Sequence, residues 1–589
     1  MFVQRAALWL SLGSLAFAGT IPRDASPVVA ERQAATTTTL VPDGACTNNA
    51  RTRNCWSDGF SIATDFDAKA PPAGKTVTYD LEITNTTANL DGHGDKPVML
   101  INGQYPGPTI RAKWGDTLVI NVKNSLQDNG TGIHWHGIRQ LNSCQHDGVG
   151  GITECPIAPN KTRTYTFKCT QFGTTWYHSH WSAQYGEGVV GTMIIDGPAT
   201  APYDEDLGVL PITDWYYAPA FELNEQAQHS VRGPPEADNI LVNGTHVNAD
   251  GGGKYAKMTV TKGKRYRVRL INTSMDTVFH VSFDNHPMTV ITSDFVPIKS
   301  FVADQVTLAI GQRYDVIINA NQTVGNYWMR VMIGTACGNN KILDANLPNI
   351  GAILSYSGAE SGNPTTSGVT MRTGCDDEAL SNLVPFVKND VPKSVVPTEL
   401  DLNNLPQTPP ENLFRWTIDD SSHVVDWNEP TLEVALGEGN DFGNNSNVYT
   451  IPTKDNWYMW WIQTRSNIPL PHPIHLHGHD FYILGTGGGV WDGDTSKLKF
   501  DNPPRRDTAT LPGGGYLLLA FPADNPGTWV MHCHIAFHAS QGLSLQFLEQ
   551  RGSIKSTIGN LDEFNKGCKE WNEYWVPGNH PYNQTDSGL

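Results

Sequence analysis

Basic residues are scarce in this sequence. Its 41 lysines and arginines are outnumbered by 59 aspartates and glutamates, which gives a formal net charge of −18. A surface with this excess of negative charge repels nucleic-acid phosphates and anionic lipid headgroups. We therefore expect neither nucleic acid nor an anionic membrane surface as a partner.

Long hydrophobic runs are missing beyond the N-terminus. No later run approaches the roughly 18 apolar residues that a membrane-spanning helix needs. Residues 1–18 have the pattern of a secretory signal peptide, in which Arg5 supplies the positive charge and residues 6–15 the apolar stretch. The polar, threonine-rich residues 19–42 then form a pro-segment or a disordered arm. We expect a soluble, secreted and extracellular mature protein.

Long amphipathic helical patterns are also few, whereas short strand-like runs recur. Examples are residues 117–122, 266–270 and 516–521, each bounded by Gly, Pro or Asn. Such runs predict an all-β protein of sandwiches or barrels. A chain of 589 residues is too long for one core and suggests about three or four domains.

Two short sequences echo each other and support repeated domains. Leu100-Ile101-Asn102-Gly103 returns as Leu241-Val242-Asn243-Gly244. Boundaries are expected near Pro198-Ala199 and in the Ser- and Thr-rich stretch around 356–375. The predicted domains are residues 43–198, 199–370 and 371–589.

Cysteines are few and odd in number, nine in all. In a secreted chain, eight can pair and one is left over. The odd one is Cys533, which His532 and His534 flank and His538 follows. Because strand neighbours point to opposite faces, Cys533 would face one side and its two flanking histidines the other. A thiolate with imidazoles is the ligand set of a blue-copper centre, and the flanking histidines would then serve a second metal centre on the far side.

Three further segments carry paired histidines. A single His-x-His pair is as easily a surface or core feature as a metal site. Together, however, the four segments hold ten of the nineteen histidines. The three are His134-Trp135-His136, His178-Ser179-His180 and His472-Pro473-Ile474-His475-Leu476-His477.

These four segments, in this order, resemble the copper-binding motifs of the multicopper oxidases. Along nearly its whole length the chain is similar to the ascomycete-type fungal laccases within that family. Further matches are the run Asn502 to Thr508 (NPPRRDT), Leu543, and the last four residues, Asp586-Ser587-Gly588-Leu589. The resemblance implies three consecutive Greek-key cupredoxin-like β-barrels, with the copper motifs in the first and third. The middle domain would be a spacer that also shapes a cleft.

The resemblance also implies four copper ions and their ligands. The type-1 copper would be held by His472, Cys533 and His538. The type-2 copper would be held by His134 and His475. The two type-3 coppers would be held by His136, His178 and His534, and by His180, His477 and His532. Leu543 would occupy the axial position of the type-1 copper, where it cannot coordinate; losing an axial donor raises the reduction potential.

Three more positions acquire roles from the same resemblance. Asp147 matches a carboxylate implicated in proton delivery, although Asp-Gly is also a common turn. Asp276 matches an acidic residue that faces the phenolic hydroxyl, although by itself it is only a loop residue. The tail ending at Leu589 would enter the channel to the trinuclear centre, and no C-terminal processing would be needed to form it. Without the resemblance it would be taken for a frayed terminus.

The disulfide pairs follow in part from the resemblance, which suggests Cys46–Cys55, Cys155–Cys568 and Cys337–Cys375. Elimination then leaves Cys144–Cys169 as a hypothesis. Eight N-x-[ST] sequons are compatible with a secreted glycoprotein.

The expected function is that of a laccase, which oxidises phenolic or other aromatic donors at the type-1 copper and reduces O2 to water at the trinuclear cluster. Four electrons are needed for each O2, and they are expected to enter through the edge of His472 or, in preference, of His538. A ferroxidase of the same fold is the nearest alternative and would need carboxylates around the outer copper. A non-enzymatic copper carrier or store is a third, but it would not need eight further histidines. We expect a monomer.

Overall fold

The computed structural model describes residues 47–576 and 584–589, except 58, 231, 336, 338–350, 410 and 444. The predicted signal peptide (1–18), the predicted pro-segment (19–42) and Cys46 lie outside the described residues. Among the described residues, no helix is both long and apolar enough to cross a membrane.

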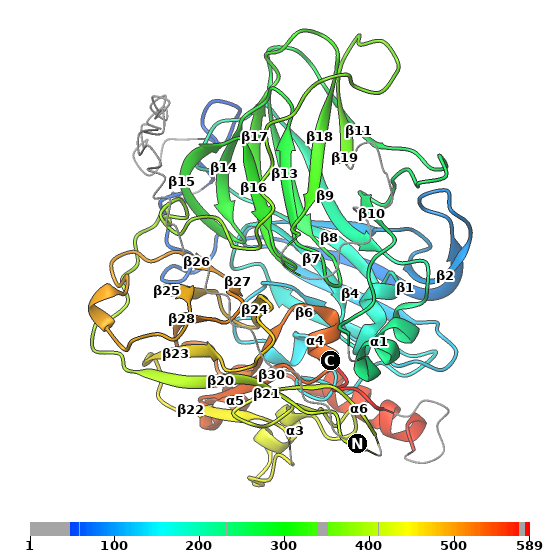
Figure 1. The fold of residues 1–589 in the computed structure, drawn as a ribbon. Coiled ribbons are helices and arrows are strands. Elements are labelled where there is room, and N and C mark those ends of the chain that lie inside the picture. Colours follow the sequence, from blue (N-terminus) through cyan, green and yellow to red (C-terminus); the bar gives the residue numbers. More distant parts are fainter. Residues whose placement is uncertain are drawn as a thin grey trace, which may run out of the picture. The chain divides into compact units, whose positions relative to one another are not determined.

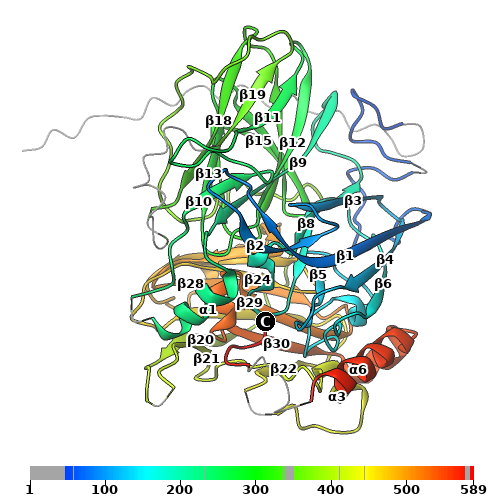
Figure 2. The same cartoon turned by 90° about the vertical axis from the view of Figure 1, so that its right-hand side faces the viewer.

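Six β-sheets arranged in three consecutive pairs form the fold (Figures 1 and 2). The first pair has the strand orders β2-β1-β4-β6 and β3-β8-β7-β5. In β4, every second residue is fully buried (Leu118, Ile120 and Val122), which is the alternation expected for a strand with one face on a core. The strands are β1 (Thr76–Ala88), β2 (Lys96–Ile101), β3 (Gly107–Lys113), β4 (Thr117–Asn124), β5 (Ile133–Trp135), β6 (Thr162–Lys168), β7 (Gly173–Ser179) and β8 (Val190–Asp196).

The second pair has the orders β10-β9-β12-β17-β14-β15 and β11-β19-β18-β13-β16. Its strands are β9 (Glu205–Trp215), β10 (Asn239–Val242), β11 (Ala256–Val260), β12 (Arg265–Asn272), β13 (Phe279–Phe283), β14 (Met288–Ser293), β15 (Val296–Ala303), β16 (Gln305–Leu308), β17 (Arg313–Asn319), β18 (Asn326–Ile333) and β19 (Gly351–Tyr356). These strands are green in Figure 1.

The third pair has the orders β21-β20-β23-β28-β25-β26 and β22-β30-β29-β24-β27. Its strands are β20 (Pro397–Leu405), β21 (Arg415–Ile418), β22 (Val448–Ile451), β23 (Trp457–Thr464), β24 (His472–Leu476), β25 (Phe481–Gly488), β26 (Arg505–Arg506), β27 (Thr508–Leu511), β28 (Gly515–Pro522), β29 (Gly527–Cys533) and β30 (Ser544–Glu549).

Among the described residues the helices are short, the longest having 13 residues. They are the 3-10 helices η1 (Cys144–His146), η2 (Ser182–Glu187) and η3 (Thr495–Lys497), and the α-helices α1 (Ala220–His229), α3 (Thr431–Leu436), α4 (Ala536–Ser540), α5 (Arg551–Thr557) and α6 (Asp562–Tyr574). The prediction of an all-β chain with three consecutive β-domains is confirmed. The boundaries near 198 and 370 stay predictions.

The internal echo in the sequence corresponds to a repeated turn. Asn102 and Asn243 have φ angles of 52° and 49°, and Gly103 and Gly244 follow with 69° and 78°. Asn and Gly tolerate this left-handed backbone, which is required at both central positions of a tight hairpin turn. Two similar four-residue sequences thus mark the end of β2 in the first domain and of β10 in the second.

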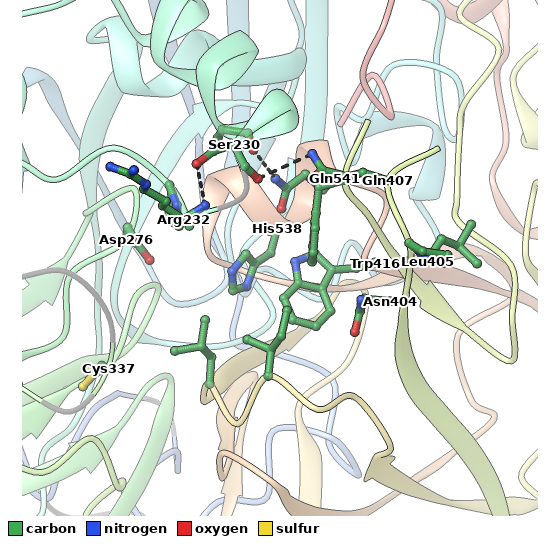
Figure 3. A pocket seen from close by; sticks show the side chains of 17 residues that line it. Ser230, Arg232, Asp276, Cys337, Asn404, Leu405, Gln407, Trp416, His538 and Gln541 are labelled. Atoms are coloured by element: carbon green, nitrogen blue, oxygen red, sulfur yellow. Dashed lines mark hydrogen bonds between the residues drawn. The ribbon is translucent and has the colours of Figure 1, made fainter. Parts of the chain in front are cut away.

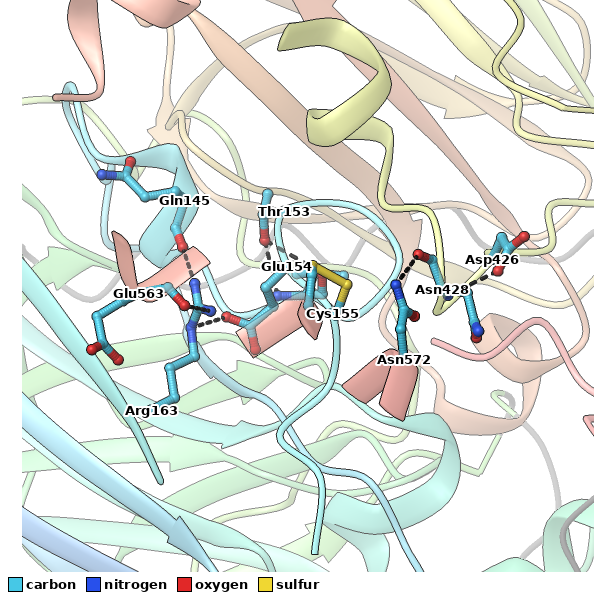
Figure 4. Close-up of a disulfide and its surroundings, with 11 residues drawn as sticks. Gln145, Thr153, Glu154, Cys155, Arg163, Asp426, Asn428, Glu563 and Asn572 are labelled. Carbon is cyan, nitrogen blue, oxygen red and sulfur yellow. Dashed lines mark hydrogen bonds and ion pairs between the residues drawn. A yellow bond between two sulfur atoms is a disulfide. The ribbon is translucent and has the colours of Figure 1, made fainter. Parts of the chain in front are cut away.

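Two of the expected disulfides are present. Cys155 is bonded to Cys568, 413 residues away, and this bond ties the loop after η1 to helix α6 (Figure 4). Cys337 is bonded to Cys375. Cys55 is also disulfide-bonded, while its expected partner Cys46 lies outside the described residues.

The Cys144–Cys169 pairing is wrong. Both cysteines are free and buried. Cys144 packs in a cluster with Trp529 and Trp181, whereas Cys169 belongs to the separate core of the first domain, with Phe167 and Phe172. An even number of remaining cysteines does not require that all of them pair, because a buried cysteine also serves as a small apolar core residue.

The sequon at Asn272 is not accessible. Its side chain is fully buried, and its amide donates hydrogen bonds to the carbonyl oxygens of Thr277 and Leu308. A glycan cannot be attached there without unfolding the end of β12.

Candidate metal centres

The first candidate centre is built from three side chains of the third domain. His472 begins β24, Cys533 ends β29, and His538 lies on α4. The Cys533 Sγ lies 3.6 Å from the Nδ1 atoms of both histidines, and these two nitrogens are 3.1 Å apart. All three side chains are buried. We call this set the outer centre.

The donor set of the outer centre fits copper. Burial lowers the pKa of His472 to about 3 and that of His538 well below its usual range, so both rings stay neutral. The outer centre brings two neutral imidazole nitrogens and a thiol sulfur together in a buried site. These groups form only weak hydrogen bonds with one another. A soft cation such as copper satisfies all three.

The outer centre is anchored from the backbone side by Leu543. The Cys533 N–H donates to the Leu543 carbonyl at 3.0 Å, and the Leu543 N–H donates to the His538 carbonyl at 3.1 Å. The Leu543 side chain is fully buried and offers no ligand atom. Its assignment to the axial position stays a prediction.

The second candidate centre gathers the other eight predicted histidines from two domains. They come from the ends of β5, β7, β24 and β29, and none is more than 4% exposed. Across the domains, the His180 and His532 Nε2 atoms are 3.4 Å apart, and His136 Nδ1 and His534 Nε2 are 3.2 Å apart. We call this set the inner centre; it comprises His134, His136, His178, His180, His475, His477, His532 and His534.

Hydrogen bonds fix which ring nitrogens face inward. The Nδ1–H groups of His134 and His475 donate to the carbonyls of Asp147 (3.0 Å) and Asp507 (2.8 Å), and that of His178 donates to the Ser179 carbonyl (3.0 Å). These partners assign the tautomer and leave Nε2 as a lone pair. The three Nε2 atoms are buried and have no hydrogen-bond partner in the described chain.

The inner centre therefore also fits copper. Burial, together with the neighbouring imidazoles, lowers the pKa of His475 and His180 well below the usual range. These rings therefore stay neutral, and each keeps a nitrogen lone pair that can bind a metal. His180, His477 and His532 place one nitrogen each within 4.8 Å of one another, in agreement with the grouping expected for one copper. Other groupings, such as His134 with His475 and His477, meet the same limit, so the division among coppers stays a prediction.

The end of β29 contributes side chains to both centres. In the sheet, Ile474 pairs with Cys533 and His475 pairs with His532. Cys533 thus lies in the outer centre while its neighbours His532 and His534 lie in the inner one. This is the arrangement expected from the alternation of side chains along a strand.

Models of the multicopper oxidase family match three segments, residues 82–200, 206–359 and 407–553. Laccase-1 of Melanocarpus albomyces is 45% identical over 92% of this chain and 89% of its own length. Laccase-3 of Botryotinia fuckeliana is 50% identical over 75% of this chain and its full length. The chain belongs to the multicopper oxidase family. It accordingly uses copper as its cofactor.

Comparison with solved structures agrees with the assignment of this chain to the multicopper oxidase family. The crystal structure of a laccase from Botrytis aclada superposes with a TM-score of 0.87 at 43% identity, covering 92% of this chain and all of that one. Fet3p, a multicopper oxidase that functions in iron import, superposes with a TM-score of 0.75 at 24% identity, covering 87% of this chain and 98% of its own. The second likeness shows the fold alone. The three domains are cupredoxin-like.

A pocket of about 480 Å³ adjoins the outer centre of this multicopper oxidase (Figure 3). His538 and Asp276 both line it, so the structure brings together the two residues expected at the donor end. Trp416 forms part of the wall, and its ring centre lies 5.0 Å from that of His538. The pocket thus combines an apolar wall, one carboxylate and one edge of the outer centre.

Asp147 lies against the inner centre and is fully buried. Its Oδ2 accepts a hydrogen bond of 2.8 Å from His477 Nδ1, and its Oδ1 lies 3.3 Å from His134 Nδ1. Asp147 therefore orients two predicted copper ligands, His477 through its carboxylate and His134 through its backbone carbonyl. Its role in proton delivery stays a prediction.

The C-terminal tail, residues 584–589, is not frayed. Asp586 accepts hydrogen bonds from Ser182 and from Asn224, the latter at 3.1 Å, and the Ser587 N–H donates to the Ser540 carbonyl at 2.8 Å. Leu589 is 4% exposed and lines a cavity of about 20 Å³ together with His178, His180, His532 and His534. The tail ends against the inner centre, as its expected role requires.

A buried ion pair behind His136 was not anticipated from the sequence. Asp507 Oδ1 lies 3.2 Å from His136 Nε2, and Asp507 Oδ2 accepts a 2.7 Å hydrogen bond from Arg313 of the second domain. Gly311 of that domain also packs against His136 and His534; a Cβ there would lie only 3.0 Å from His136. The middle domain is thus a support for the inner centre as well as a spacer. Asp507 belongs to the NPPRRDT run, but nothing in that run indicates its partner.

Proposed function

We propose that this chain is a secreted, monomeric laccase that oxidises phenolic donors one electron at a time and reduces O2 to water. The observation that carries the proposal is the continuity from the donor pocket through His538 and Cys533 to the inner centre. A small aromatic molecule in the pocket would lie beside the outer centre, whereas O2 chemistry would be confined to a buried site. Bound copper would supply the redox chemistry that connects the two.

We further propose the ligand division expected for one type-1, one type-2 and two type-3 coppers. His472, Cys533 and His538 would hold the first, and His134 and His475 the second. The pair would be held by His136, His178 and His534, and by His180, His477 and His532.

The residues around the donor have two tasks. The His538 ring presents an edge to the pocket, and Asp276 would accept the phenolic proton. Burial, reinforced by the neighbouring Asp214, raises the pKa of Asp276 well above its usual range, which makes its carboxylate a stronger base than an exposed one. At the other end, Asp147 would supply protons beside the inner centre.

A ferroxidase is less consistent with the pocket. Binding Fe(II) favours several oxygen ligands, since hard cations prefer carboxylates. Among the described residues that line the pocket, Asp276 is the one carboxylate; the other walls are apolar or carry amides, the Ser230 hydroxyl and the Arg232 guanidinium.

The test is oxygen uptake by the copper-loaded protein, with a dimethoxyphenol or Fe(II) as the sole donor in matched buffers. We expect fast uptake with the phenol, slow uptake with Fe(II), and no release of peroxide. A preference for Fe(II) would reassign the chain as a ferroxidase. No uptake with either donor would favour a copper carrier.

A further inference from the structure

We propose that Asp214 is a positioning residue for Asp276: it fixes the loop that carries Asp276, and its negative charge sets the pH at which Asp276 accepts the phenolic proton. This inference rests on the proposed function, because it assumes a phenol in the donor pocket.

Asp214 holds this loop from the end of β9. It is 4% exposed, and its Oδ1 accepts a hydrogen bond from the Met275 N–H at 2.8 Å. Its Oδ2 accepts from the Asp276 N–H at 2.9 Å and from the Thr277 hydroxyl at 3.0 Å. In return, the Asp214 N–H donates to the Ser274 hydroxyl at 3.0 Å. Both carboxylate oxygens are thus committed to one four-residue loop.

The same loop is docked on the helix that carries His538. The Met275 carbonyl accepts a 2.8 Å hydrogen bond from the N–H of Ala536, the first residue of α4. The loop is therefore held by Asp214 on one side and by α4 on the other. This double attachment fixes Asp276 relative to His538; Figure 3 shows both side chains in the lining of the pocket.

The charges around the two carboxylates do not cancel. Tyr216 donates to Asp214 at 3.4 Å, and Tyr185 donates to the Ser274 carbonyl at 3.0 Å. The other titratable or charged groups nearby are Tyr105, Cys533, and His538 and Arg232 of the pocket. In the part of the chain that the structure describes, neither carboxylate has an ion-pair partner. Two buried carboxylates without a cation do not ionise independently.

The two carboxylates differ in their hydrogen bonds. Burial raises the pKa of both carboxyls, that of Asp276 well above its usual range, but Asp214 accepts from two backbone N–H groups and two hydroxyls, which favour its ionised form. Asp276 accepts none from the described residues and opens into the pocket. Asp214 is consequently the fixed charge, and Asp276 is the group that gains and loses the proton.

In the proposed step, the phenol O–H bond would break and its proton would bind to the Asp276 carboxylate. Copper held by His472, Cys533 and His538 would supply the one-electron oxidant, so that a neutral phenoxyl radical would remain. Asp276 then returns the proton to water in the pocket. Asp214 keeps its charge throughout and makes Asp276 the stronger base.

The experiment compares kcat/KM against pH for a dimethoxyphenol and for ferrocyanide, a one-electron donor without an acidic proton, in the copper-loaded enzyme. Asp214→Asn removes the charge, so Asp276 should ionise at lower pH. A neighbouring like charge raises a carboxyl pKa by about one unit or more. We therefore expect the acidic limb of the profile of kcat/KM against pH for the phenol to move down by about one pH unit. The ferrocyanide profile should not move.

Thr277→Val is the matched control, because it perturbs the same loop but keeps both carboxylates. Removing one donor leaves the charge of Asp214 less compensated, so the limb should move slightly up. Asp276→Asn should abolish the limb, and adding Asp214→Asn to it should change nothing further.

A uniform loss of phenol activity in Asp214→Asn without a shift of the limb would reduce Asp214 to a structural role and overturn the proposal. If Asp214→Asn does not fold, a downward or absent shift in Thr277→Val overturns it as well. Failure of the wild-type enzyme to oxidise phenol would instead contradict the proposed function.

Discussion

The outer and inner centres are constructed in opposite ways. The outer centre takes its three ligands from one domain and borders a pocket of about 480 Å³. The inner centre takes eight histidines from the first and third domains and is supported by Arg313 of the middle domain. It adjoins a cavity of only about 20 Å³. One centre is local and accessible to donors of various shapes. The other depends on assembly of the domains and admits only very small molecules.

Contacts between the first and third domains sustain the inner centre. Arg139, three residues after His136, pairs with Asp524 of the third domain at 2.6 Å. The Cys155–Cys568 disulfide joins the first domain to α6 (Figure 4). Damage to this interface should therefore reach the inner centre before the outer one.

The sharpest separation of the two centres should come from Cys533→Ser. Without the soft thiolate, the outer centre should lose its copper and the blue absorption, and donor oxidation should fall below detection. The inner centre should keep its copper because none of its ligands changes. Copper content per chain, the visible spectrum and oxygen uptake measure this. Loss of the inner copper as well would mean that the centres are not independent.

A change confined to the inner centre should follow from Asp147→Asn. The amide can still hydrogen-bond to His477 but carries no charge and is a poor proton donor. We expect turnover to fall by about ten- to a hundredfold, the usual range for partners of metal ligands. The blue absorption should persist, and reduction of the outer centre by the phenol under anaerobic conditions should keep its rate. Slower anaerobic reduction would contradict the separation of the centres.

The smallest expected effect is that of deleting residues 586–589. Among the described residues, the tail makes no hydrogen bond to the inner histidines, so we expect turnover to change less than about tenfold, below the range for direct partners of metal ligands. The near-ultraviolet absorption of the inner centre should change, and the blue absorption should not. Leu589→Ala, which keeps the hydrogen-bonded backbone, is the graded control. An unchanged spectrum after deletion would show that the tail only covers the surface.

The side of the strand on which each histidine and cysteine of β29 lies could be predicted from the sequence, because it is a local property. Alternation along β29 decides that Cys533 and His532 face opposite sides, whatever the rest of the chain does. The all-β fold was predictable for the same reason, from short strand-like runs and turn residues.

Features that depend on distant partners could not be predicted. Asp507 contacts His136 and is held in place by Arg313, which lies 194 positions from Asp507 in the sequence. No spacing rule links Asp507 to Arg313. Asp214 resembles any acidic residue at the end of a strand until the fold places the Asp276 loop on it. The Cys144–Cys169 pairing failed because parity says nothing about which cysteines approach each other.

The buried tail has a practical consequence for handling the protein. Leu589 is 4% exposed and packs among the inner histidines, so residues added after it have no room. A purification tag or reporter fused at this end would have to pull the tail out and open the interior to solvent and chelators. Insertion in an exposed loop such as that at Gly94, between β1 and β2, leaves that interior closed and is the safer site for a label.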